Sequence, residues 1–162
     1  MTRIFVTVGA QMPFDRLVHA VDAWAYTRGR SADVLAQIGP SVAPPSHVKH
    51  VRFLEPAEFD RAYDEADLVV AHAGTGSILA ALERGKAIVV MPRRAALRET
   101  RNDHQVATAK AFAAIGSVPV AWDETELAEV LDRATISRGE AVVGRYASPR
   151  LIGAIKSFVE SP

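Results

Sequence analysis

The residues best suited to chemistry form a short polar turn between two apolar segments, His72-Ala-Gly-Thr-Gly-Ser77. Gly74 and Gly76 allow a ligand to approach the backbone closely, and Thr75 and Ser77 supply hydroxyl groups. Where such a turn opens a helix, the free N–H groups and the positive end of the helix dipole attract an anion. The turn therefore predicts a seat for a diphosphate, although a tightly packed turn that binds no ligand has the same composition.

Two better-known phosphate motifs are excluded by the spacing of this turn. No Gly-Lys-Ser/Thr follows at the distance that a P-loop requires, and the full Gly-x-Gly-x-x-Gly dinucleotide fingerprint is missing. His72 precedes the glycines at a strand end. Its ring is expected to contact a donor, to orient the loop or to pack as a neutral group.

The segments on either side of the turn explain how it is positioned. Leu68 to Ala71 and Ala87 to Met91 are apolar runs with the length of buried strands. Between them Ile78, Leu79 and Leu82 recur at helical spacing, and Gly85 is expected to end the helix in the left-handed conformation. A β-α-β unit of this kind places the turn at the carboxyl edge of a parallel sheet, where ligands of open α/β sheets bind.

The rest of the chain alternates between strands and helices in the same way. Further strands are predicted over 3–8, 34–38, 48–54 and 118–121, with helices over 14–28, from Pro56, from Asn102–Gln105, after Asp123 and from Ser148. About six strands alternating with helices predict a doubly wound, mostly parallel, Rossmann-like α/β sheet. We expect residues 1–162 to form a single domain that binds the donor nucleotide.

Composition limits the partners and the compartment. The 162 residues carry a formal net charge of +0, so the chain has no electrostatic footprint for a nucleic acid. The absence of cysteine excludes thiolate catalysis, and the five histidines lack metal-ligand spacing, so no metal is predicted. No apolar run approaches the roughly 20 residues of a membrane span, and no signal-peptide pattern opens the chain. These features predict a cytoplasmic protein.

The segment 92–101 contains four arginines and no helix or strand period. A solvated loop is one interpretation. A mobile basic lid is the other, with Arg93 or Arg94 assisting the reaction. Its positive charge favours an acidic ligand such as a uronate.

Three separated stretches together resemble the carboxyl-terminal, MurG-like domain of family 28 glycosyltransferases. They are Thr7-Val-Gly-Ala-Gln11 with Phe14-Asp-Arg-Leu17, His72-Ala-Gly-Thr-Gly-Ser-Ile-Leu79 with Gly85-Lys86, and Pro92-Arg-Arg94 with Asn102-Asp-His-Gln105. The resemblance spans roughly residues 3–135. The sequence of the third stretch resembles that of donor-binding subunits of split transferases, of the kind that act in bacterial exopolysaccharide synthesis.

The resemblance implies one half of a GT-B enzyme, in which this half binds a UDP-sugar and the other half binds the acceptor. It implies that the diphosphate is held by Gly74, Thr75, Gly76 and Ser77 and that Gly9 and Gln11 line the cleft. It also implies that Phe53 and Leu54 border the uracil and that His104 and Gln105 reach the sugar hydroxyls. The donor is a substrate, and no cofactor is expected.

One position departs from the family pattern. Many relatives carry a glutamate six residues after the glycine that corresponds to Gly74, and this chain has Ala80 there. Glu83, one helical turn further on, is a candidate replacement for ribose binding, and a solvated surface glutamate is the alternative.

The resulting hypothesis is a catalytic-complex subunit that is active only with a partner. It would transfer a hexose, uronate or N-acetylhexosamine to a polyprenyl-diphosphate-linked sugar in exopolysaccharide or glycolipid synthesis. The partner is expected to be a membrane-associated acceptor-binding subunit that supplies the general base and holds this chain at the inner face of the membrane. A non-catalytic nucleotide-binding interaction module is the alternative.

Overall fold

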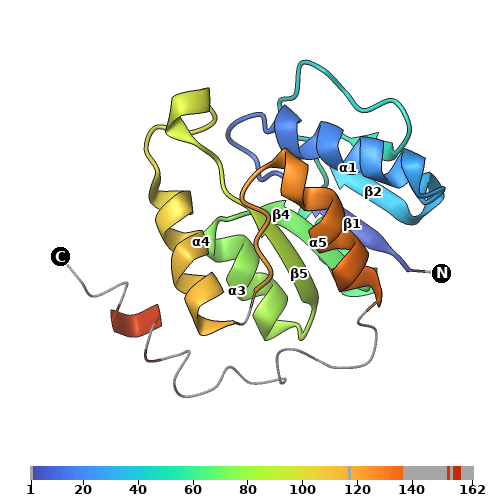
Figure 1. Ribbon diagram of the computed structural model, residues 1–162. Helices are drawn as coiled ribbons and strands as arrows, with labels where there is room; N and C mark the ends of the chain where they lie inside the picture. Colours follow the sequence, from blue (N-terminus) through green and yellow to red (C-terminus); the bar gives the residue numbers. More distant parts are fainter. Residues whose placement is uncertain (1, 117, 137–152, 154, 158–162) are drawn as a thin grey trace.

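Five parallel strands form one twisted sheet at the centre of the molecule (Figure 1). The computed structural model describes residues 2–116, 118–136, 153 and 155–157. The strands are β1 (Ile4–Thr7), β2 (Val34–Gln37), β3 (Lys49–Val51), β4 (Leu68–His72) and β5 (Ala87–Met91). Their order, β3-β2-β1-β4-β5, confirms the predicted doubly wound sheet. The order reverses between β1 and β4, which is the topological switch point of such a sheet.

Helices cover both faces of the sheet. They are α1 (Asp15–Thr27), α2 (Pro56–Glu65), α3 (Thr75–Glu83), α4 (His104–Ile115) and α5 (Glu124–Ile136), with short 3-10 turns η1 (Ser31–Asp33) and η2 (Ala95–Leu97). Helices α1 and α5 lie side by side on one face, and α3 and α4 lie on the other (Figure 1). The molecule is therefore a three-layer α/β/α sandwich.

Alternation along the strands divides the apolar residues between two cores. In β4, Leu68 and Val70 join the core beneath α1 and α5, whereas Val69 and Ala71 join the core beneath α2, α3 and α4. Successive side chains of a strand point to opposite faces, so a strand covered on both faces is apolar throughout. Because these strands are covered on both faces, continuous apolar runs in the sequence predicted the positions of β1, β4 and β5 correctly.

Two predicted strands are shorter than expected. The segment 48–54 pairs only over Lys49–Val51, because the chain must leave the sheet edge before Pro56 and the Glu55–Glu58 capping box begin α2. The segment 118–121 makes only one bridge, from Val120 to Val90. Pro119 accepts a bond from Val90 N–H but has no N–H to donate, so this sixth pairing stays rudimentary.

The helix boundaries around the glycine turn were predicted correctly. Helix α3 begins at Thr75 after Gly74, and Gly85 follows its end with φ +61°. Of the predicted terminal helix, Gly153 and residues 155–157 are helical, and Ile155 packs against the α2–α3–α4 core. The rest of this predicted helix lies outside the described residues.

Across the described part of the chain, no helix combines the length and the apolar character that crossing a bilayer requires.

A buried carboxylate fixes the connection between β2 and β3. Asp22 of α1 accepts hydrogen bonds from the backbone N–H groups of Ser46, His47 and Val48 at 3.1, 2.8 and 2.9 Å. The carboxylate thereby satisfies three loop donors, of which that of Val48 is buried and those of Ser46 and His47 belong to exposed residues.

Asp22→Ala leaves these donors without their acceptor and should lower the free energy of unfolding by about 3 kcal/mol. Asp64→Ala is the control, since that exposed carboxylate pairs only with Arg84 at the surface, and it should change stability by less than about 0.5 kcal/mol. Urea denaturation measures both. Equal effects of the two changes would contradict this role for Asp22.

Candidate functional site

The centre of the candidate site is the imidazole of His72 at the carboxyl end of β4. A Cβ atom built at Gly74 would lie 2.4 Å from His72 Nε2, and one built at Gly9 would lie 3.1 Å from Cε1. Gly9 also has φ +76°, a conformation that other residues rarely adopt. The ring therefore packs between the turn after β1 and the turn after β4, at the switch point of the sheet.

His72 is neutral at physiological pH. Its pKa is lowered to about 4, chiefly because burial disfavours the charged form and secondly because of the positive charge of Arg93. A backbone contact with Thr7 opposes the shift, and His104 adds to it. The ring thus acts as an uncharged packing group, which is one of the roles expected for it.

The first turn of α3 offers free donors beside this ring. Gly74 is the N-cap, and the first intrahelical bond runs from Ile78 N–H to the Gly74 carbonyl oxygen at 3.1 Å. The N–H groups of Thr75, Gly76 and Ser77 consequently have no acceptor within the helix. Together with the helix dipole they form a seat for an anion.

Gly76 has no packing reason to be glycine. It is exposed, lies inside α3, and no heavy atom comes within 4 Å of a Cβ built on it. Glycine in a helix costs up to about 1 kcal/mol relative to alanine. A side chain at position 74 would clash with His72, so packing explains Gly74. The open space at Gly76 instead leaves room for a ligand to lie against the backbone.

The position of Arg93 contradicts the prediction that this residue belongs to a mobile basic lid. Its side chain is buried, and its guanidinium donates to the carbonyl oxygens of Pro13, Val8 and Met12 at 2.6, 2.6 and 2.8 Å. A further bond reaches the carbonyl oxygen of Glu99 at 3.2 Å. An arginine held in this way fixes the loop after β1. The neighbouring Arg94 is also engaged, donating to the Trp122 carbonyl oxygen at 2.8 Å.

A network that the sequence did not reveal supports the same loops. Arg16 of α1 forms a two-pronged ion pair with Glu99, with both N–O distances 2.8 Å, and contacts Glu124 at 2.9 Å. Glu99 also accepts from Arg94 N–H at 2.9 Å. Arg16 and Glu99 are 83 positions apart, and no local pattern joins them. Thr7 Oγ1 donates a hydrogen bond to Gln37 Oε1 at 2.8 Å. The sequence indicates this pair only through the polar residue at the end of each of the two buried strands.

His104 and Gln105 stand at the start of α4 but differ in environment. His104 is exposed and its ring contacts Asn102. Gln105 is buried, and its Oε1 accepts from Arg93 N–H at 3.1 Å, so the amide NH2 is the part that remains for a ligand. His104 contributes to the lowered pKa of His72, which places α4 on the same side of the switch point.

The remaining predicted site residues are more dispersed. Gln11 is exposed in the loop after β1, and Phe53 is 52% exposed after β3. Because β3 and β4 are three strand spacings apart, Phe53 is roughly 14 Å from the glycine turn, whereas Leu54 packs against the same core as α3. Glu83 is exposed at the last position of α3, about 12 Å along the helix from Thr75. The fold therefore does not bring Glu83 to the first turn.

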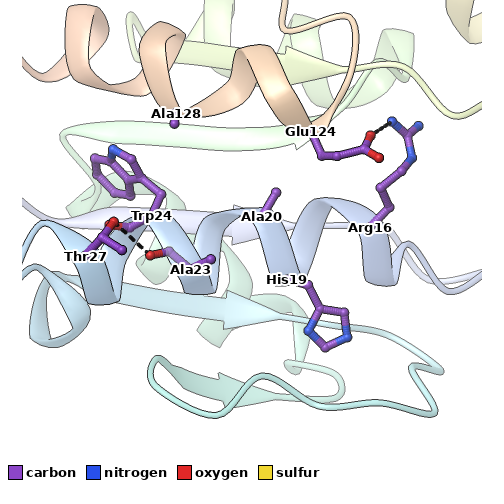
Figure 2. Close-up of a pocket in the computed structure, with 8 residues that line it drawn as sticks. All are labelled: Arg16, His19, Ala20, Ala23, Trp24, Thr27, Glu124 and Ala128. Carbon is purple, nitrogen blue, oxygen red and sulfur yellow. Dashed lines mark hydrogen bonds and ion pairs between the residues drawn. The ribbon is translucent and has the colours of Figure 1, made fainter.

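An open surface groove lies in another part of the molecule (Figure 2). It has a volume of about 500 Å³ and lies between α1 and α5, on the face opposite α3. Its lining residues are Arg16, His19, Ala20, Ala23, Trp24, Thr27, Glu124 and Ala128. None of the residues predicted to bind the donor lines it. Among the described residues, no group of three or more His, Cys, Asp or Glu side chains is arranged to hold a metal ion.

Several solved structures share this fold, and glycosyltransferases are among them. The chain superposes on MurG of Acinetobacter baumannii with a TM-score of 0.64 and 21% identity, covering 100% of this chain and 50% of that one. It superposes on the solution structure of ALG13 with a TM-score of 0.63 and 21% identity, covering 97% and 94%. It superposes on SnogD of Streptomyces nogalater with a TM-score of 0.59 and 20% identity, covering 99% of this chain and 40% of that one. The sheet and its helices thus have the fold of one half of a GT-B glycosyltransferase.

Sequence comparison defines the family. The profile described as "Glycosyltransferase family 28 C-terminal domain" matches residues 3–140, so the chain belongs to this family. A relative from Eremothecium gossypii, "UDP-N-acetylglucosamine transferase subunit ALG13", is 44% identical over 71 residues, which cover 43% of this chain and 33% of that protein. A "UDP-N-acetylglucosamine--N-acetylmuramyl-(pentapeptide) pyrophosphoryl-undecaprenol N-acetylglucosamine transferase" of Acinetobacter baumannii is 32% identical over 107 residues, covering 66% and 26%. The matches span about a third and a quarter of these relatives.

The two glycines of the turn should respond differently to alanine. Gly74→Ala places its Cβ against the His72 ring and should destabilise the fold by about 1–3 kcal/mol. Gly76→Ala meets open space and should leave stability unchanged or raise it by up to about 1 kcal/mol. Denaturant unfolding of both variants is the measurement. Removing the ring with His72→Ala should abolish most of the Gly74→Ala penalty, and fully additive effects would contradict the proposed packing.

His72 should make stability depend on pH. Above pH 6.5 both native and unfolded chains hold a neutral ring, but between pH 6.5 and about 4 only the unfolded chain takes up the proton. The native state should therefore lose on the order of 3 kcal/mol over this range. Comparing the pH dependence of unfolding with that of His72→Gln isolates this contribution. Parallel curves would show that the pKa of His72 is not lowered.

Proposed function

We propose that this chain binds the UDP-sugar donor of a two-component glycosyltransferase. The diphosphate would lie at the first turn of α3, against the N–H groups of Thr75, Gly76 and Ser77. The observation that carries the proposal is Gly76, an exposed helical glycine whose missing side chain leaves the backbone open where the free donors point. The "UDP-N-acetylglucosamine transferase subunit" in the printed name of one relative supports a sugar nucleotide as the ligand.

The catalytic contribution of the seat would be electrostatic. Negative charge grows on the departing UDP as the sugar is transferred, and preorganised N–H donors at a helix start stabilise that charge without rearranging. A neutral His72 suits this role because it holds both glycine turns in place and needs no counter-charge. The general base would come from the partner, since deprotonation of the acceptor occurs on the other side of the cleft.

The sugar would be read by the start of α4 and the loop before it. His104 and the amide NH2 of Gln105 are available for its hydroxyl groups. Since Arg93 and Arg94 are engaged by carbonyl oxygens, the exposed Arg98 and Arg101 are the remaining cations for an acidic sugar such as a uronate. A hexose, a uronate and an N-acetylhexosamine therefore all stay within the proposed substrate class.

A second subunit would complete the site. Loops after β2, β3 and β5 carry exposed apolar side chains at the carboxyl edge: Val42 is 87%, Phe53 52% and Leu97 53% exposed. A partner that covers these side chains would also exclude water, which strengthens the electrostatic effect of the α3 donors. We propose a membrane-associated subunit that presents a polyprenyl-diphosphate-linked sugar, for exopolysaccharide or glycolipid synthesis, and that recruits this cytoplasmic chain to the inner face of the membrane.

The alternative function is a non-catalytic module that senses a nucleotide. The observation in its favour is the lack of a carboxylate for the ribose, since Ala80 occupies the family position and Glu83 lies at the far end of α3. Gln105, buried and aligned by Arg93, favours the enzyme.

Gly76→Ala should separate ligand binding from folding. Its methyl group would occupy the space proposed for the diphosphate and should weaken UDP binding at least about tenfold. Binding of uridine, which lacks phosphates, should change by less than about twofold. Calorimetric titration of both ligands checks this. Unchanged UDP affinity in a stably folded Gly76→Ala variant would contradict the placement of the diphosphate.

Sugar transfer should require the second subunit. The purified chain with a lipid-linked acceptor is expected to show no appreciable turnover, and adding the acceptor-binding subunit should restore it. Gly74→Asp and Gln105→Ala should then abolish or strongly reduce transfer by the pair. Full turnover by the chain alone would contradict the two-component proposal. If the pair forms but transfers no sugar, and if neither variant weakens the interaction with the partner, the sensing module is favoured.

A further inference from the structure

Arg93 has an unusual environment for a buried cation. Every hydrogen bond of its guanidinium within the described chain goes to a backbone carbonyl oxygen, from Val8, Met12, Pro13 and Glu99. Its Cζ atom lies 4.7 Å from the centroid of the Phe14 ring, so an aromatic face covers one side. These contacts satisfy the four N–H donors of Nη1 and Nη2 but do not neutralise the charge.

Glu99, the carboxylate that raises the pKa of Arg93, uses its side chain for other partners. Glu99 uses both side-chain oxygens for Arg16 and one of them also for Arg94 N–H. Burial lowers the pKa of Arg93 more than the Glu99 charge raises it, although a guanidinium stays protonated at any physiological pH. The edge of the sheet thus contains a fixed positive charge whose desolvation is only partly offset.

This charge is connected by direct contacts to the glycine turns. Arg93 Nη2 binds the carbonyl oxygen of Val8, the residue before Gly9. Gly9 in turn packs against the His72 ring, which packs against Gly74. The field of Arg93 reaches this ring, since it is the largest charged contribution to the lowered pKa of His72, with His104 adding a smaller one.

We propose that Arg93 is a positioning residue that makes this edge of the sheet selective for a diphosphate, through its uncompensated charge and through the Gly9 turn that it fixes. The inference rests on the proposed donor site and goes beyond it. It assigns the preference for an anionic ligand to a residue that does not touch the ligand. Helix α3 supplies partial charges at the seat, and Arg93 supplies a full charge behind it.

The test compares neutral and charged replacements. Arg93→Met and Arg93→Gln remove the charge, Arg93→Lys keeps it, and Lys110→Gln removes an exposed charge from α4 as a matched control. Affinities for UDP and for uridine are measured by NMR titration of each folded variant. In the neutral Arg93 variants the UDP affinity should fall about tenfold or more relative to uridine, while Arg93→Lys and Lys110→Gln keep the ratio within about threefold. Equal losses for UDP and uridine would reduce Arg93 to a structural role and overturn the proposal.

The pKa of His72, followed by NMR of its ring, gives a second reading that needs no ligand. It should rise in Arg93→Met and Arg93→Gln and stay low in Arg93→Lys. If the wild type binds no UDP, the donor proposal and the diphosphate selectivity both fail, and the ring titration alone decides whether the Arg93 charge governs the turn. If neither neutral variant folds, Glu99→Gln decides the question. It removes the negative charge that raises the pKa of Arg93, so the UDP preference should rise, and a preference that stays constant or falls would overturn the proposal.

Discussion

The packing of one imidazole between two glycines is the constraint on which the rest of the site depends. His72 ends β4, and its ring fills the space beside Gly9 after β1 and Gly74 before α3. The contact brings together two turns that are more than sixty positions apart and sets where α3 begins. The ring is half-buried and neutral, so it holds the two turns by packing and leaves the N–H groups of α3 as the donors for an anion.

The hydrogen bonds of two arginines also hold the loops around this packing in place. Arg93 connects the loop after β1 to the loop after β5 by carbonyl contacts, and the Arg16–Glu99 pair joins α1 to the same loop. A buried arginine is costly unless its donors are hydrogen-bonded, and here carbonyl oxygens accept from both Nη1 and Nη2. The outcome is a rigid carboxyl edge in which free helical N–H groups and a fixed positive charge are both in place before a ligand arrives. Such preorganisation is what electrostatic stabilisation of a leaving group requires.

Much of the fold could be predicted because its information is local. Apolar runs marked β1, β4 and β5, and the position of Gly85 marked the end of α3. Edge elements were less predictable, since 48–54 and 118–121 have strand-like composition but lose pairing to Pro56 and Pro119. The glycine turn was recognisable from residue types alone. By contrast, the burial of Arg93 depends on carbonyl oxygens about 80 positions away, so the same arginine-rich segment could equally suggest a lid. Glu83 lies at the last position of α3, and its role toward a ribose stays a prediction.

The central claim is that a nucleoside diphosphate binds at the switch point between β1 and β4, against the first turn of α3. The most direct test is a titration of the isotopically labelled chain with UDP, followed through the backbone amide resonances. We predict that the largest shifts fall on Gly9 and on Gly74 to Ser77, with saturable binding. Shifts confined instead to the groove between α1 and α5, at residues such as His19, Trp24 and Ala128, or no shifts at millimolar UDP, would contradict the account.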